Sequence, residues 1–383
     1  MTKLNELIQQ FCPDGVEYKK VKDVFRRLRG TPITAGKMKE IADENGEIMV
    51  FAGGRTIISA READIPKANI TRVPAVLVQS RGVIDVVYYD KPFTFKNEMW
   101  AYTADDKIKV KYLYYVLKNN IQSFRDAASG MGSLPQISLS VTEEFRIPLP
   151  PIEVQREIVR ILDNFTELTA ELTAELTAEL TARKKQYEYY RDSLFAVDNT
   201  EITWTTLDRI SENCDRQRKP VTKGNRVAGK YPYYGASGIV DYVADYIFDG
   251  DYLLVSEDGA NLIARSTPIA FSVSGKTWVN NHAHVLKFDT YELRRYVEIY
   301  LNSVDLSRYI SGGAQPKLSQ ENLNKIPIPV PSAERIKYVV SILDRFDILC
   351  NDLTTGLPAE IAARQKQYEY YRDKLLTFKE LGA

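Results

Sequence analysis

Residues 169–180 read Thr169-Ala-Glu-Leu172, Thr173-Ala-Glu-Leu176 and Thr177-Ala-Glu-Leu180, a perfect four-residue repeat. On an α-helix, a step of four residues places each side chain almost above the equivalent one before it. The glutamates therefore form an acidic stripe and the leucines form an apolar one, Leu168, Leu172, Leu176 and Leu180. Neither Gly nor Pro occurs in residues 152–192, which predicts one helix of about 40 residues, roughly 60 Å long. Such a rod needs a partner to cover its apolar stripe.

The chain provides that partner as a second copy of itself. Ile161–Phe165 recurs as Ile342–Phe346, and Arg183–Asp192 recurs as Arg364–Asp373, both at an offset of 181 positions. The same offset relates residues 135–138 to 316–319 and residues 147–150 to 328–331. The chain is therefore a duplicated unit in which each copy is a globular half followed by a long helix.

The second long helix differs from the first in one place. Opposite the repeat, residues 353–361 contain Gly356 and Pro358, which should kink or interrupt the helix. The two helices match in length because the offset holds on both sides of this segment. We therefore expect an antiparallel pair in which one member is straight and the other is bent.

Length and composition bound the class of protein. With 383 residues, 44% of them apolar, the chain has room for two or three domains. Three scattered cysteines, Cys12, Cys214 and Cys350, argue against a disulfide framework and for a reducing cytosol. The sequence has neither a signal segment nor a long apolar run, so we expect a cytoplasmic protein. Its 51 basic and 51 acidic side chains cancel, so a nucleic-acid ligand would require locally gathered positive charge or a partner that supplies it.

Each globular half shows a β pattern. Short apolar runs at residues 48–51, 75–78 and 83–89 are punctuated by Gly and Pro, and a helix at 110–124 and a Gly-rich loop at 129–133 follow. The second half repeats this order with strands at 202–207, 231–235 and 252–255, a helix at 291–302 and a loop at 311–314. Two related folds with different loops suggest related tasks on two different targets.

Two short motifs suggest an enzyme, and neither is sufficient. Residues 270–277 fit a loose phosphate-loop pattern, but the segment that follows is strand-like, so a β-hairpin turn is the better interpretation. His282 and His284 lie on an expected strand, and we do not expect them to share one metal ion. One should be packed or hydrogen-bonded, and the other could reach a ligand. A methyl-donor loop and a base-holding Asn/Asp-Pro-Pro-aromatic motif are both missing from the sequence.

The repeat, the duplicated Tyr-rich helix ends, Tyr231–Gly238 and Glu257–Asn261 together resemble the specificity subunit of type I restriction-modification enzymes. The repeat resembles that of the type IC branch, and the resemblance covers essentially the whole chain. It implies an α+β fold in which two β-rich mixed α/β target recognition domains are joined by two long helices. These helices would pair as an antiparallel coiled coil, with a pseudo-two-fold internal repeat. The domains would be residues 1–150 and 196–331, and the helices residues 151–195 and 332–383.

The same resemblance implies the function. The chain would be non-catalytic and would bind double-stranded DNA at a split site while its helices dock two methyltransferase subunits. Cleavage and translocation would belong to restriction subunits. S-adenosylmethionine, ATP and Mg are accordingly expected on the partner subunits, and neither a cofactor nor a metal on this chain. A free-standing DNA- or nucleotide-dependent enzyme and a structural coiled-coil scaffold are the alternatives.

Candidate site residues fall into two groups. At the helix interface we expect the four leucines of the stripe with Tyr187, Tyr190, Tyr368 and Tyr371, where helix packing and subunit docking are equally compatible roles for the tyrosines. Base-reading candidates are side chains with hydrogen-bonding capacity on Gly-punctuated loops: Arg55, Gln79, Arg81, Asn97, Gln136, Arg226, Ser237, Asn261, Asn280, His282, Gln315 and Lys317. Any one of them could instead be a solvated loop residue or contact a phosphate.

The repeat also predicts a geometric role. One four-residue unit lengthens a helix by about 6 Å and turns it about 40° past a full turn. One base pair advances B-DNA by about 3.4 Å and turns it by about 35°. Because the two angular steps nearly coincide, we expect that adding or removing one unit changes the gap in a split DNA site by about one base pair while both half-sites stay the same.

Overall fold

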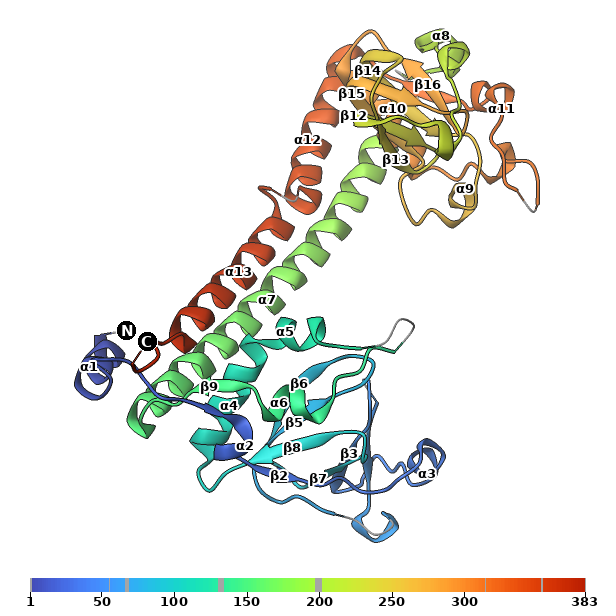
Figure 1. Cartoon of the computed structure of the whole chain (residues 1–383). Helices are drawn as coiled ribbons and strands as arrows, with labels where there is room; N and C mark the ends of the chain where they lie inside the picture. Colours follow the sequence, from blue (N-terminus) through green and yellow to red (C-terminus); the bar gives the residue numbers. More distant parts are fainter. Residues whose placement is uncertain are drawn as a thin grey trace. The chain divides into compact units, whose positions relative to one another are not determined.

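The computed structural model describes residues 2–54, 56–65, 69–129, 134–196, 202–313, 315–352 and 354–382 (Figure 1). The chain divides into two compact units, which we call the first unit (Met1–Leu176 with Ile361–Ala383) and the second unit (Thr177–Glu360). Both are mixed α/β, as expected. The division falls inside the long helix α7 (Ile152–Phe195), whose 44 residues confirm the uninterrupted helix expected from the repeat.

The described residues of the first unit form three small sheets, with strand orders β2-β8-β5-β6, β4-β3-β7 and β1-β9. Its elements, besides its part of α7 and most of α13 (Leu357–Leu376), are α1 (Thr2–Phe11), β1 (Tyr18–Lys20), α2 (Val21–Val24), β2 (Arg26–Leu28), α3 (Ala35–Glu40), β3 (Ile48–Phe51), β4 (Ile57–Ala60), η1 (Glu62–Asp64), β5 (Ala75–Gln79), β6 (Asp85–Tyr89), β7 (Phe93–Phe95), β8 (Trp100–Thr103), α4 (Lys107–Asn119), α5 (Ile121–Asp126), α6 (Leu139–Glu143) and β9 (Arg146–Pro148).

Strand β5 lies at the centre of the first unit's packing. Successive side chains of a strand point to opposite faces, and both faces of β5 are buried. Val76 and Val78 join a core formed with α4 and the start of α7, whereas Ala75 and Leu77 pack with Phe93 and its neighbours. This position explains the continuous apolar run that predicted the strand.

The helix expected at residues 110–124 is present as two helices, α4 and α5. Helix α4 begins earlier because the Asp106 side chain accepts a hydrogen bond from Ile108 N at 2.7 Å and caps its first turn. It ends at Asn119, and the side chain of the capping residue Asn120 donates to Val116 O at 2.8 Å. The helical segment itself is confirmed.

Residues near both ends of the chain complete the first unit. Leu375 and Leu376 of α13 lie in the same core as Leu4 and Cys12. Beyond α13, Arg146 Nη2 lies 2.5 Å from Glu380 Oε1, and residues 16 and 380 form a parallel bridge. The first unit is therefore assembled from two segments that are far apart in the sequence.

The second unit is organised around a six-stranded sheet of order β11-β16-β14-β15-β12-β13, with a separate β10-β17 pair. Its elements, besides its part of α7, are β10 (Thr203–Thr205), α8 (Leu207–Ile210), β11 (Glu212–Asn213), η2 (Asp215–Gln217), η3 (Lys223–Asn225), β12 (Ala228–Gly235), β13 (Gly238–Val243), β14 (Phe248–Ser256), α9 (Asn261–Ala264), β15 (Ala270–Val279), β16 (Ala283–Lys287), α10 (Tyr291–Ser303), η4 (Ser307–Tyr309), α11 (Gln320–Asn324), β17 (Ile328–Val330) and α12 (Ala333–Asn351).

The segment that resembled a phosphate loop is neither a loop nor a turn. Residues 270–277 lie within β15, so the expectation of a hairpin turn was wrong. Gly275 has a φ of +76° inside this strand and faces Gly250, with a φ of +145°, across the β14–β15 pair. Because the backbone amides belong to a sheet and no helix begins here, the segment cannot cradle a phosphate in the manner of a phosphate loop.

The long helices pair within each unit, and Figure 1 shows α7 running beside α13 and α12. In the first unit, Phe165 of α7 packs on Tyr371 of α13 at a ring distance of 5.9 Å, and Thr166 Oγ1 lies 3.0 Å from Tyr368 Oη. In the second unit, Tyr190 packs on Phe346 of α12 at 5.5 Å. In the first unit the residue number rises along α7 as it falls along α13, so the pair is antiparallel, as expected.

The expected interruption of the second helix is also present. Helix α12 ends at Asn351 and α13 begins at Leu357. A Cβ on Gly356 would lie 2.5 Å from Ile348 O and 2.7 Å from Asp352 O, so only glycine fits this close approach. Pro358 is accommodated in the first turn of α13, where its missing N–H costs nothing.

Candidate nucleic-acid interface

Two loops of the first unit meet to form what we call the first cradle, residues 80–82 with 135–137. Ile137 N donates to Ser80 O at 2.9 Å, and Gly82 N donates to Pro135 O at 2.9 Å. Arg81 and Gln136, both predicted base contacts, lie opposite each other in a bridge between the loops and are exposed. The structure thus brings together two candidates that are 55 positions apart in the sequence.

The remaining candidates of the first unit differ in exposure. Gln79 is the last residue of β5 and is only 6% exposed, so most of its side chain is covered. Asn97 is exposed and lines a hollow of about 610 Å³ together with Gln136. Arg55 and residues 130–133 of the Gly-rich loop lie outside the described residues.

The hollow also contains two basic residues that the sequence analysis overlooked, Arg27 and Arg29. Both are exposed. Arg27 lies 3.5 Å from Glu143. The dense basic run at residues 26–29 was the signal that could have identified them. Positive side chains beside hydrogen-bonding side chains are what a DNA-contacting surface requires, since phosphate and base contacts occur together.

The second unit has an equivalent arrangement, the second cradle, residues 257–259 with 316–318. Leu318 N donates to Glu257 O at 2.7 Å, and Gly259 N donates to Pro316 O at 3.1 Å. Asp258 lies opposite Lys317 in the bridge between the loops. The predicted contacts His282, Gln315, Lys317 and Ser237 are all exposed. His282 Nδ1 lies 2.8 Å from Asp258 Oδ2.

Three other candidates of the second unit are occupied by contacts within the protein. Arg226 stacks over Tyr233 at 4.3 Å and donates to Asp241 at 3.1 Å. The Asn261 amide donates to Thr267 O at 3.0 Å and closes its own loop. Asn280 is buried, and its Oδ1 accepts from His282 N at 2.8 Å. These contacts give the three side chains roles in shaping the loops. Ala314, from the expected loop at 311–314, lies outside the described residues.

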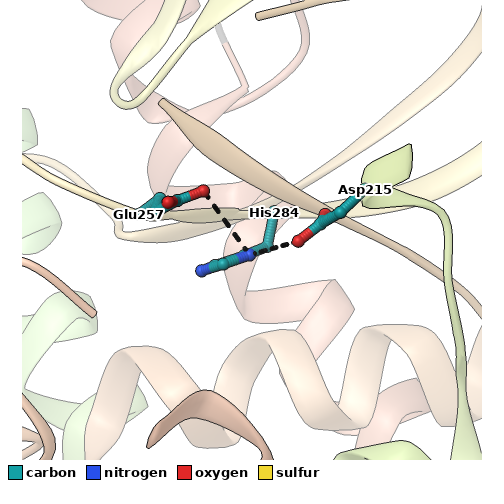
Figure 2. Close-up of side chains that lie close together, drawn as sticks. All are labelled: Asp215, Glu257 and His284. Atoms are coloured by element: carbon teal, nitrogen blue, oxygen red, sulfur yellow. Dashed lines mark hydrogen bonds and ion pairs between the residues drawn. The ribbon is translucent and has the colours of Figure 1, made fainter. Parts of the chain in front are cut away.

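Beneath the second cradle lies a buried charged cluster that the sequence analysis missed (Figure 2). His284 is 1% exposed; its Nδ1 lies 2.6 Å from Asp215 Oδ2, and its Nε2 lies 2.8 Å from Leu318 O. This confirms that one of the two histidines is packed and hydrogen-bonded. Glu257 Oε2 lies 3.8 Å from the same Nδ1. Arg218 joins both carboxylates, at 2.6 Å from Glu257 and 3.2 Å from Asp215.

Asp215, Glu257 and His284 are close enough together to hold a metal ion. However, both ring nitrogens of His284 already lie within hydrogen-bond distance of oxygen atoms, Asp215 Oδ2 and Leu318 O. The carboxylates are already engaged by Arg218, and Lys317 Nζ lies 3.2 Å from Glu257. The arrangement therefore fits a closed ion-pair network, which ties η2, the end of β14 and β16 together, better than it fits a metal site.

The network keeps both carboxylates ionised. Burial alone would raise the pKa of Asp215, but the hydrogen bond and charge of His284 outweigh it and hold that pKa below its usual 3.8. Burial likewise acts against Glu257, but the hydrogen bond from Arg218 and the charge of His284 lower its pKa from 4.5. Folding and ionisation of this cluster are therefore linked.

The predicted tyrosines of the helix interface face the opposite helix. Tyr187 and Tyr190 pack on Phe346, and Tyr371 and Tyr368 contact α7 in the first unit. Their neighbours Tyr189 and Tyr370, which are equivalent residues of the two copies of the duplicated unit, are 69% and 61% exposed. Leu168 is exposed beside an apolar hollow of about 230 Å³ that Leu172 also lines, and Leu172, Leu176 and Leu180 are half-buried.

The family pattern described as "Type I restriction modification DNA specificity domain" matches the chain twice, over residues 13–182 and 201–363. The chain belongs to this family. The two matches correspond to the two copies of the duplicated unit, and each covers one of the two cradles.

Individual proteins that are similar to this chain are also specificity subunits. The chain is 37% identical over 190 residues to a putative type I restriction enzyme specificity subunit of Haemophilus influenzae, a match that spans 49% of each chain. It is 34% identical over 299 residues to the specificity subunit of a type I restriction enzyme of Escherichia coli, covering 72% of each chain. The crystal structure of an S subunit from M. genitalium superimposes with a TM-score of 0.54 at 20% identity, over 94% of this chain and 96% of that one. This last likeness supports the fold.

In the described residues of the chain, none of the helices is long and apolar enough to cross a membrane.

Proposed function

We propose that this chain is the DNA-reading subunit of a type I restriction-modification enzyme and that it recognises a bipartite DNA site, with one part read by each unit. The observation that carries the proposal is the doubled specificity-domain match. A single reader would need one such domain, whereas two copies with different exposed side chains are suited to two different half-sites.

The helices provide a surface for partner subunits. Tyr189 and Tyr370 are exposed at equivalent positions of the two copies of the duplicated unit, one in each compact unit. Two copies of one surface fit two copies of one partner, and exposed aromatic side chains are frequent anchors in protein interfaces. We therefore assign these helix faces to two methyltransferase subunits. The restriction subunits, which would cleave DNA, join the same enzyme in the cytoplasm.

The chemistry belongs to the partners. S-adenosylmethionine would bind to the methyltransferase subunits, and ATP and Mg to the restriction subunits. This chain would contribute sequence recognition and the spacing of the two half-sites. The length of α7 supports the second role, because a continuous helix changes its length and rotation by a fixed amount for each residue added.

The test uses the chain purified with and without the modification methyltransferase of its own system. We expect DNA binding to strengthen when the methyltransferase is added, and the complex to place N6-methyladenine on both strands of a split motif with a constant gap. Methyl transfer or cleavage by the chain alone would support a free-standing enzyme instead. Binding without sequence preference would favour a scaffold.

A further inference from the structure

The two cradles are built by the same backbone hydrogen bonds. The bond from Ile137 N to Ser80 O corresponds to the bond from Leu318 N to Glu257 O. The second bond, from the glycine of each turn to a proline carbonyl, is also present in both. Both glycines have positive φ, +78° at Gly82 and +105° at Gly259. The equivalence of the backbones therefore places Asp258 where the first unit has Arg81, and Lys317 where it has Gln136.

A third position completes the correspondence. Strand β5 pairs with β8 so that Val78 faces Trp100, and β14 pairs with β16 so that Val255 faces His284. Glu98, two residues before Trp100, accepts a hydrogen bond from Ser80 Oγ at its backbone oxygen. His282, two residues before His284, accepts one from Glu257 N at 2.8 Å in the same way. Glu98 of the first unit is thus equivalent to His282 of the second.

The floor of each cradle contains a buried apolar residue, and its three outward positions differ between the two units. Ile137 below the first cradle and its equivalent Leu318 below the second are both buried. Above these floors, the first unit presents Arg81, Gln136 and Glu98, and the second presents Asp258, Lys317 and His282. The charge reverses between Arg81 and Asp258. A fixed backbone that carries exchangeable side chains is the arrangement that precise recognition requires.

The chemistry of these pairs matches different bases. Arginine and lysine pair with guanine, glutamine pairs with adenine, and a carboxylate accepts from the amino group of cytosine. We propose that the two cradle pairs, Arg81 with Gln136 and Asp258 with Lys317, determine base preference at one or two adjacent positions in their respective half-sites. This proposal rests on the proposed function and identifies the side chains that distinguish the two readers.

The test transfers the first pair into the second unit. The double variant Asp258→Arg/Lys317→Gln, in complex with the methyltransferase, is used to methylate a library of DNA with randomised bases, and the methylated sites are sequenced. We expect preference in the second half-site to change by about tenfold or more at one or two positions, while the first half-site and the gap stay as in the wild type.

The matched control is Lys325→Gln. Lys325 is 59% exposed and pairs with Glu321 at 2.6 Å, as Lys317 is 54% exposed and pairs with Glu257 at 3.2 Å. Lys325 lies outside the cradle, and its substitution should leave the motif unchanged.

If the double variant does not fold, the single variant Lys317→Gln gives the decision by the same measurement. An unchanged motif, or a uniform loss of methylation at all sequences, would assign these residues a structural or phosphate-contacting role and overturn the proposal. Absence of any split motif in the wild type would instead reject the proposed function itself.

Discussion

The two copies of the duplicated unit agree in the contacts that pair the long helices and build the cradles, and they differ at the helix break and in a buried charged network. Phe165 with Tyr371 in the first unit and Phe346 with Tyr190 in the second are the same contact, related by the offset of 181 positions. The cradle hydrogen bonds also agree. By contrast, α7 is continuous, whereas α12 and α13 are separate helices. The position of Ser80 in the first cradle is occupied in the second by Glu257, which belongs to the buried charged network. The two copies therefore share a scaffold, whereas the helix break and the outward cradle positions differ between them.

The largest expected effect concerns the continuous helix. Insertion of one further Thr-Ala-Glu-Leu unit after Leu180 should abolish methylation of the original site and produce a motif with a gap about one base pair longer, since the insertion turns the helix about 40° past a full turn, close to the rotation of about 35° per base pair of B-DNA. Methylation profiling of the variant complex measures this change. Replacement of Thr173–Leu176 by four other helix-forming residues keeps the length and should keep the gap. An unchanged gap after insertion would refute the spacing role of α7.

The second effect tests the buried charged network around Glu257 in the second copy. Glu257→Gln should lower the free energy of unfolding by about 3 kcal/mol at neutral pH, because it leaves Arg218 buried beside one carboxylate instead of two. Chemical denaturation measures the loss. Glu321→Gln, at an exposed carboxylate, is the control and should change little.

The same residue predicts a pH dependence. The pKa of Glu257 is lower in the folded protein than its usual 4.5, so its ionisation stabilises the fold above that pH. The stabilisation is lost as the pH falls below 4.5 and through the folded pKa. We therefore expect the acid-induced loss of stability to be smaller in Glu257→Gln than in the wild type. Equal pH profiles would show that the carboxylate is not linked to folding.

A third, smaller effect compares the two equivalent helix contacts directly. Phe165→Ala and Phe346→Ala should each cost about 2 kcal/mol, because each removes a half-buried aromatic ring from the helix pairing. Unfolding followed by circular dichroism measures both. Similar losses would confirm that the copies share one packing scheme, whereas a loss in only one would show that the equivalence is limited to geometry.

The smallest effect concerns the break between α12 and α13. Gly356→Ala should destabilise the protein by about 1 kcal/mol, because its Cβ would lie 2.5 Å from Ile348 O and force the backbone to shift. Gly224→Ala, where a Cβ meets nothing within 4 Å, is the control. An unchanged free energy of unfolding in Gly356→Ala would indicate that the backbone between α12 and α13 shifts readily.

The periodic features of this chain could be predicted from sequence because their causes are local. The repeat without Gly or Pro predicts α7, and Gly356 with Pro358 predicts the break. Strand β15 could not be predicted, because the chain alone does not reveal that Gly275 faces Gly250 across two strands. The buried network was missed for the same reason: Asp215 and His284 are 69 positions apart and meet only through the sheet. Arg81, Gln136 and Lys317 were predicted as loop residues and Asp258 was not, and the pairing of these side chains required the fold.

The composition of the first unit has a consequence for biosynthesis. Its core contains Leu4 from the beginning of the chain and Leu375 from α13, whereas the second unit is one contiguous segment, Thr177–Glu360. On the ribosome, the unit that is translated later should therefore be the first to finish folding. The first unit, although translated earlier, keeps an exposed apolar surface until residues 361–382 emerge. We therefore expect nascent chains that stop before this region to bind chaperones.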